Sequence, residues 1–294
     1  MKNSAPAAAK KMTNKKIYLL VLLPFLIVAF LYELLPLAML IVDSFGLDGD
    51  KSVLFTLQNY AKIFSTLSYK KAITNSLEIT LLSTIIGIFV AFMGAKAAHT
   101  SRGKFRGAFM TVLNMTSNFA GVPLAFAYMI VLGTSGVVRQ IANIYGIEFI
   151  QNFDLYTSKG LILMYVYFQI PLSTLLLIPA FNGIRREWQE ANLLLGGRNS
   201  TFWFKVGIPV LIPSIFGTIS VLFANALCAY ATAYALLMNN FSLLPVNISA
   251  MFTGDIASKP HLGAALSVVM MLLMCAAILI DNYIIKATTR WNAR

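Results

Sequence analysis

The sequence predicts an all-α membrane protein with six membrane-spanning helices. Of its 294 residues, 58% are hydrophobic and only 12% are charged, which is too little polar surface to cover a water-soluble globule of this length. Apolar runs of about 20 residues, the length a helix needs to cross about 30 Å of hydrocarbon, recur along the whole chain. The six runs are 17–43, 75–98, 107–133, 159–183, 205–238 and 260–285.

The first and fifth runs are longer than one crossing requires, so each is expected to tilt, break or extend past the membrane. Prolines are natural break points within them, at Pro24 and Pro36 in the first run and at Pro209 and Pro213 in the fifth. The first connection, 44–74, is expected to hold an amphipathic helix. The residues that recur there at helical spacing are Leu57, Tyr60, Ile63, Phe64 and Leu67.

The distribution of basic residues predicts the orientation, because loops that stay in the cytoplasm keep an excess of Lys and Arg. With the N-terminus inside, the inside segments hold sixteen of the 23 Lys and Arg residues, so both termini are expected in the cytoplasm. The predicted parts are a basic cytoplasmic N-terminus at 1–16, a first membrane helix at 17–43, an outer loop at 44–74, a five-helix core at 75–285, and a cytoplasmic C-terminus at 286–294. The cytoplasmic bias and the attraction of basic residues to membrane lipid headgroups account for the net charge of +12, so no nucleic-acid partner is expected.

A polar stretch at 184–204 interrupts the core on the predicted cytoplasmic side. Trp188, Ala191 and Leu195 share one face of a short predicted helix, and Gly196 and Gly197 end it. A second helix is expected to begin near Asn199, Ser200 or Thr201, which are all good N-caps, and to run into the membrane. Such a helical elbow can fit a groove on a soluble partner and transmit a movement of that partner to the membrane helices.

This elbow resembles the signature of the permease subunits of bacterial ABC importers, known as the EAA motif. Glu190 and Ala191, then Gly196 and Gly197, and finally Ile208, Pro209 and Pro213 carry the resemblance. The chain departs from the usual motif at Asn192, where a second Ala is usual, and at Leu195, where Asp is usual. FTLQNYAKIF at 55–64, NSLEITLLSTIIGI at 75–88 and GAALSVVMMLLM at 263–274 extend the resemblance to the spermidine/putrescine permease group and its iron, phosphonate and thiamine relatives.

The resemblance implies the type I importer (MetI-like) permease fold, with the elbow as a coupling helix that docks on an ATPase. The residues it assigns to coupling are Trp188, Glu190, Ala191, Leu194, Gly196 and Gly197. The partners it implies are two ABC ATPase subunits, which carry the ATP and Mg, a second homologous permease, and an extracytoplasmic substrate-binding protein or lipoprotein. The bacterial plasma (inner) membrane is the expected location, and a polyamine such as spermidine or putrescine is the leading substrate. Ferric iron, phosphonate, thiamine and sugar are the alternatives.

No enzymatic activity is expected of this chain. It has no phosphate-binding GxxxxGK[ST] sequence, its carboxylates and two histidines are not grouped, and Cys228 and Cys275 have no second Cys or His at ligand spacing. Catalytic residues, metal ligands and cofactors are therefore not expected in this chain.

Polar residues within the membrane runs are the candidates for a translocation path. These are Glu33 in the first run and Asn225, Tyr230, Thr232 and Tyr234 in the fifth. Their alternative roles are a structural hydrogen bond for Glu33, and close helix packing or interfacial anchoring for the others. An ion-coupled secondary transporter is the alternative class, although six spans without an internal repeat make only half of such a pathway.

Overall fold

The computed structural model describes residues 21–49, 55–101, 103–238, 240–253 and 258–292, with side chains up to residue 287. Within these ranges the regular structure is helical, with no strand, and six segments are long and apolar enough to cross a membrane. The predicted all-α class with six helices of membrane-spanning length is thus confirmed. The predicted N-terminal segment 1–16 lies outside the described residues, as do residues 17–20 of the first predicted span and 293–294 of the predicted C-terminal segment. The six segments are Val21–Asp43, Leu67–Thr100, Val122–Tyr145, Ser158–Asn182, Asn199–Leu227 and Pro260–Ala287.

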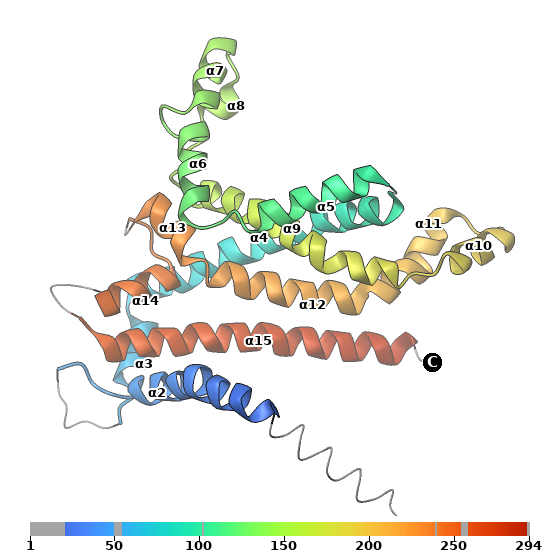
Figure 1. Ribbon diagram of the computed structural model, residues 1–294. Helices are drawn as coiled ribbons and strands as arrows, with labels where there is room; N and C mark the ends of the chain where they lie inside the picture. The colour runs from blue at the N-terminus through green and yellow to red at the C-terminus, as the bar shows by residue number, and fades with distance from the viewer. Residues whose placement is uncertain (1–20, 50–54, 102, 239, 254–257, 293–294) are drawn as a thin grey trace, which may run out of the picture.

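Long helices that run alongside one another form the body of the molecule (Figure 1). They are α4 (Leu67–Thr100), α9 (Ser158–Asn182), α12 (Ile208–Leu227) and α15 (Pro260–Asn292). The helix α2 (Leu35–Asp43) and the π-helical turn η1 (Phe30–Leu34) precede them in the chain. Figure 1 shows α2 beside α15, on the side of α15 away from α12.

The contact between α4 and α9 is made by small residues. Ser83, Gly87, Ala91 and Ala95 all lie on the buried face of α4. In a membrane, where lipid is as apolar as leucine, helices associate through close backbone approach and polar contacts between them. Gln169 of α9 is fully buried against this face, and its Nε2 donates a hydrogen bond to Ser83 Oγ at 3.0 Å.

The third predicted span, 107–133, is two helices instead of one. The structure has α5 (Lys104–Ser117), a break, and then α6 (Val122–Leu132), so the third apolar segment begins at Val122 and continues into α7 (Val137–Tyr145). Gly121 has φ of +72°, a conformation that favours glycine, and Pro123 stands in the first turn of α6. Figure 1 shows α5 alongside α9, whereas α6 and α7 leave the bundle as an arm.

The fifth predicted span, 205–238, is also broken. It begins in the π-helical turn η2 (Trp203–Gly207), α12 ends at Leu227, and the chain turns before α13 (Tyr230–Leu237). At this turn the hydroxyl of Tyr165, on α9, donates a 2.6 Å hydrogen bond to the Ala229 carbonyl. A carbonyl freed at a helix break inside a membrane protein needs such a donor, so α9 stabilises the turn.

The remaining connections lie at the two ends of the bundle. At one end are α3 (Gln58–Ser65), α13 and α14 (Leu244–Thr253), and at the other are α10 (Arg186–Leu194), α11 (Asn199–Phe202) and the C-terminal end of α15 (Figure 1). The helix α3 lies within the loop in which an amphipathic helix is predicted. The Asp48 carboxylate ties this loop to the start of α15, since it accepts hydrogen bonds from the backbone N–H groups of His261 and Leu262.

Candidate functional site

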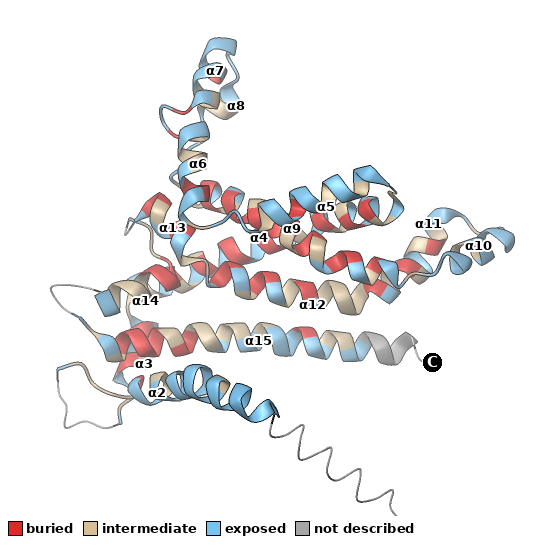
Figure 2. Cartoon of the chain, viewed as in Figure 1, coloured by how far each residue is buried: buried red, intermediate tan, exposed pale blue. Residues whose placement is uncertain are grey.

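The helical elbow between α9 and α12 projects from one end of the bundle (Figure 1). It consists of α10, a glycine turn and α11, and it passes through η2 into α12. Every residue of α10 is exposed or partly exposed (Figure 2). A short helix with no buried face gains nothing from packing within its own chain, so its surface is available to a partner.

The exposed surface of the elbow is apolar at its tip. Leu193, Leu194 and Leu195 are consecutive, and the last two are 89% and 88% exposed. Large apolar side chains gathered on a protruding helix end are typical of a surface that another protein covers. Leu194, one of the six coupling residues that the resemblance predicts, lies at this tip. Leu195, beside it, stands where the usual motif has Asp.

Two backbone hydrogen bonds end α10 as a rigid turn. The N–H of Gly197 donates to the Asn192 carbonyl at 2.9 Å, and the N–H of Gly196 donates to the Leu193 carbonyl at 3.0 Å. This is the Schellman pattern, which needs a left-handed residue just after the helix, and Gly196 has φ of +74°. A Cβ at Gly197 would overlap the Asn192 side chain, so both glycines are required by the geometry of the turn.

Asn192 and Gln189 hold α10 against α11. Asn192 Nδ2 donates to the Arg198 carbonyl at 3.2 Å, and Gln189 Nε2 donates to Asn199 Oδ1 at 3.1 Å. The sequence departs at Asn192 from the motif that it resembles, and in the structure the amide at this position links the two sides of the turn. Sequence reasoning missed this role, because the turn partner is six residues away.

The other predicted coupling residues all lie on α10. Trp188 is 39% exposed and Ala191 is exposed. Glu190 Oε1 lies 4.0 Å from Nε of Arg186, one turn earlier. The side chain of Arg186 is 74% exposed and that of Glu190 is 65% exposed, so the Glu190 carboxylate remains open to a partner. The structure therefore brings all six predicted coupling residues together in one projecting elbow.

The elbow is anchored to the bundle through aromatic side chains. Phe202 is 1% exposed, and the ring of Trp203 packs against that of Phe181, near the end of α9, with centroids 6.0 Å apart. Lys96, near the end of α4, lies 4.4 Å from the centre of the Trp203 ring. The base of the elbow thus contacts α9 and α4 through Trp203, and the chain continues from it directly into α12.

Four of the predicted path residues lie around the break between α12 and α13. Asn225 is exposed on α12, and its side chain makes no hydrogen bond within the described residues. Tyr230 and Tyr234 stack on α13 with ring centroids 5.2 Å apart. Thr232 differs from them because it is buried and its Oγ1 accepts a hydrogen bond from the N–H of Gly121, which ties α13 to the start of α6.

Glu33, the fifth predicted path residue, lies apart from these four. It is exposed on η1, which leads into α2 beside α15, whereas α12 lies on the opposite side of α15 (Figure 1). Within one chain, therefore, the structure does not bring Glu33 to the α12–α13 break.

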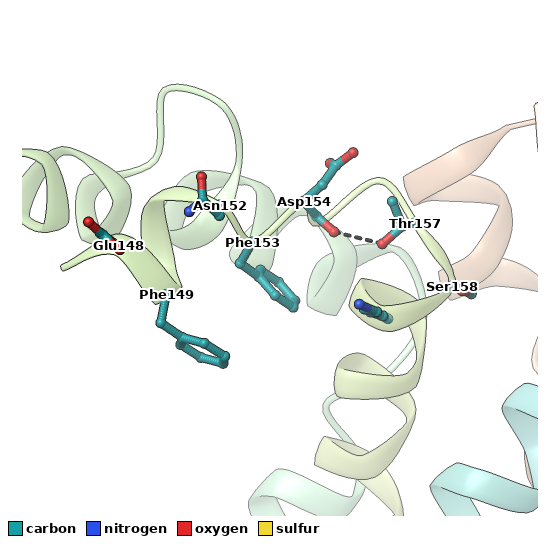
Figure 3. Close-up of a pocket in the computed structure, with 8 residues that line it drawn as sticks. Glu148, Phe149, Asn152, Phe153, Asp154, Thr157 and Ser158 are labelled. Carbon is teal, nitrogen blue, oxygen red and sulfur yellow. Dashed lines mark hydrogen bonds between the residues drawn. The ribbon is translucent and has the colours of Figure 1, made fainter.

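A cavity of about 610 Å³ lies where α8 (Glu148–Gln151) leads into α9, on the arm and away from the elbow. Figure 3 shows that Phe149 and Phe153 share it with the polar residues Asn152, Asp154 and Thr157; Thr157 Oγ1 donates to the Asp154 carbonyl at 2.8 Å. Sequence reasoning did not single out these residues. Among the described residues, no group of three or more His, Cys, Asp or Glu side chains is placed to hold a metal ion.

Curated proteins similar to this chain are permease subunits of ABC transport systems. The sulfoquinovosyl glycerol permease of Agrobacterium fabrum is 27% identical over 72% of this chain and 69% of its own length. The spermidine/putrescine permease of Haemophilus influenzae is 26% identical over 63% and 65%. Other relatives are named as permeases for sulfate, thiamine and trehalose/maltose. No protein-family model matches the chain.

Solved structures agree with this likeness. A chain of a bacterial ABC transporter that imports the acidic polysaccharide alginate has a TM-score of 0.74 at 15% identity, covering 97% of this chain and 99% of its own. Its complex with a periplasmic protein that holds an alginate pentasaccharide gives a TM-score of 0.72. The chain thus has the fold of an ABC importer permease and is similar in sequence to ABC permease subunits. The substrates named for these relatives differ, so the likeness identifies a kind of subunit and no particular solute.

Proposed function

We propose that this chain is the permease subunit of an ATP-driven importer and that α10 couples it to a separate ATPase. The projecting elbow carries this proposal: α10 has no buried residue, its tip is apolar, and its C-terminal turn is held by two backbone hydrogen bonds. Such a surface fits a groove on a soluble protein. The apolar tip would fill that groove, while Glu190 and Trp188 would make the polar and aromatic contacts beside it.

We place the elbow in the cytoplasm, together with both termini, on the distribution of basic residues. Arg185, Arg186, Arg198 and Lys205 all lie in or beside the elbow, at the end of the bundle where α15 also ends. The opposite end, with α3, α13 and α14, would then face a substrate-binding protein outside.

The proposed mechanism is alternating access. Six spans without an internal repeat supply half a pathway, so a second permease, either a homologous chain or another copy of this one, would complete it. Closure of two ATPase subunits on ATP would draw the two elbows together. Because Trp203 contacts both Phe181 and Lys96, each elbow would carry α4, α9 and α12 with it and open the path outward.

We propose that the path runs past the α12–α13 break. Asn225 is an exposed polar residue within the fifth apolar segment, and intramembrane polar groups commonly face a path or a partner. Tyr234 is exposed on α13, just beyond the end of that segment. Thr232 would hold this region in shape instead of touching the solute, since its hydroxyl is already bonded to Gly121. Glu33 would reach such a path only if the second permease packs against η1.

The sequence resemblance suggests a polyamine as the transported solute, with ferric iron and phosphonate as alternatives. The names of the relatives add sulfate, sugars and thiamine as candidates. A self-contained ion-coupled transporter is the competing function, and the observation against it is the exposed elbow, which such a transporter would not require.

Purification of the tagged chain from its native membrane in mild detergent tests the proposal. We expect an ABC ATPase and a second six-span permease to co-purify, together with ATPase activity. The substrate-binding protein encoded or captured with them would then be screened against polyamines, sugars, sulfate and thiamine. A chain that purifies without an ATPase while still driving uptake under an ion gradient would contradict the proposal and support the secondary transporter.

A further inference from the structure

A cleft of about 440 Å³ lies between the end of α4 and the inner side of the elbow. Lys96 and His99 line it from α4, Arg185 and Arg186 from the start of α10, and Trp203 from η2. No Asp or Glu side chain is among the residues that line it. The cleft is thus a concentration of positive charge without a carboxylate in its wall, and it suits an anionic ligand.

The cations of this cleft are largely unneutralised within the described part of the chain. Lys96 Nζ lies over the face of Trp203, and neither it nor the Arg185 side chain has a hydrogen bond or ion pair there. Arg186 has the exposed Glu190 at 4.0 Å, while His99 Nδ1 lies 3.3 Å from Asn182 Oδ1. Two full charges therefore remain available, and a guanidinium beside an ammonium is a common arrangement for binding phosphate oxygens.

The position of the cleft points to the source of that phosphate. Lys96 is in the last turns of α4, and Arg185 follows the end of α9 by three residues, so the cleft lies where membrane helices end. Phe89 and Met93 are 69% and 61% exposed, and they precede Lys96 at helical spacing on the same side of α4. An apolar stripe that leads to a basic pocket with a tryptophan matches a lipid with its acyl chain along the helix and its headgroup in the cleft.

We propose that this cleft binds a phosphate group and that its occupant is the headgroup of an anionic phospholipid. Lys96 and Arg185 would contact the phosphate, and Trp203 would hold Lys96 in place. A lipid bound here would connect α4 to the elbow at the point where the elbow meets the bundle.

Native mass spectrometry of the full chain, titrated with phosphatidylglycerol or phosphatidylcholine, tests it. Removing two charges, in Lys96→Gln with Arg185→Gln, is expected to weaken phosphatidylglycerol binding roughly thirtyfold, the equivalent of about 1 kcal/mol per basic residue. Lys104→Gln with Arg106→Gln removes the same charge from α5, outside the residues that line the cleft, and should change the affinity less than about twofold. Phosphatidylcholine binding should be equal in all of them.

Further arms of the experiment separate the possible ligands. Lys96→Arg with Arg185→Lys keeps both charges and should retain binding, which shows that the loss follows charge; unchanged phosphatidylcholine binding by the Lys96→Gln/Arg185→Gln variant shows that it is still folded. Inorganic phosphate and ATP are titrated in parallel: binding of either that requires Lys96 and Arg185, without phosphatidylglycerol binding, would keep the phosphate site and assign it a soluble ligand. Equal phosphatidylglycerol affinity in the two charge-removal variants would overturn the proposal. So would loss of a co-purifying ATPase with unchanged lipid affinity, because the cleft would then be a subunit contact.

Discussion

Leu194→Asp is expected to lower ATP-dependent uptake at least tenfold, while the protein still folds. Leu194 is 89% exposed, so a charge there should change the stability of the isolated chain by only about 0.5 kcal/mol. In the proposed complex the same position lies in a groove, where a buried carboxylate without a partner costs roughly 2 kcal/mol or more and weakens association about thirtyfold. The measurements are uptake in cells and the amount of ATPase that co-purifies.

The control for this prediction is the same substitution at an equally exposed apolar residue elsewhere. Ile144 is 79% exposed on α7, in the arm and away from the elbow (Figure 1). Ile144→Asp should retain the ATPase, whereas Leu194→Asp should lose it. If both variants retain the ATPase and wild-type uptake, the assignment of α10 as the coupling helix is wrong.

Gly87→Leu is expected to destabilise the whole bundle. A Cβ at Gly87 would lie 3.1 Å from Gln169 Cβ and 3.2 Å from Gln169 Oε1, and Gln169 is fully buried between α4 and α9. A leucine would need still more room, so it would separate the two helices and break the bond from Gln169 to Ser83. Overpacking and the lost hydrogen bond together should cost about 2 to 5 kcal/mol. The expected result, compared with wild type, is a much lower yield of monodisperse purified protein and a lower melting temperature.

Gly217→Leu is the matched control. Gly217 is exposed on α12, and a Cβ added there would meet no atom within 4 Å. The same glycine-to-leucine change in a membrane helix should therefore leave yield and melting temperature close to wild type. Equal losses in the two variants would mean that helix packing at Gly87 is not the cause.

The sequence was sufficient for the fold class, because apolar runs of membrane length are a strong signal, but it did not locate two helix breaks. The break between α5 and α6 has a local signal in Gly121 and Pro123, but the apolar run 107–133 continues across it and so predicts a single span. The break after α12 depends on the Tyr165 hydroxyl from another helix, which no local pattern reveals. No local pattern reveals the partner of Asp281 either: this residue is buried on α15, and its carboxylate accepts a hydrogen bond from Ser220 of α12.

For the candidate site, the glycine pair and the preceding helix were predictable, since the Schellman turn is a local motif. The role of Asn192 was not, because it depends on how the chain folds back after Gly197. Polarity alone grouped Glu33 with Asn225 and Tyr234, whereas the packing of α2 against α15 separates them within one chain. The basic cleft was also missed, because its residues come from three segments of the chain.

Site-specific photo-cross-linking tests the central claim, that the elbow touches an ATPase. A photo-reactive residue is placed at Leu194 of the full-length chain, with Ile144 as the control position, and irradiation is carried out in the native membrane. We predict a cross-link from position 194 to an ABC ATPase and none from position 144 to that protein. A cross-link from 194 only to lipid or to a protein without an ATP-binding domain would contradict the account.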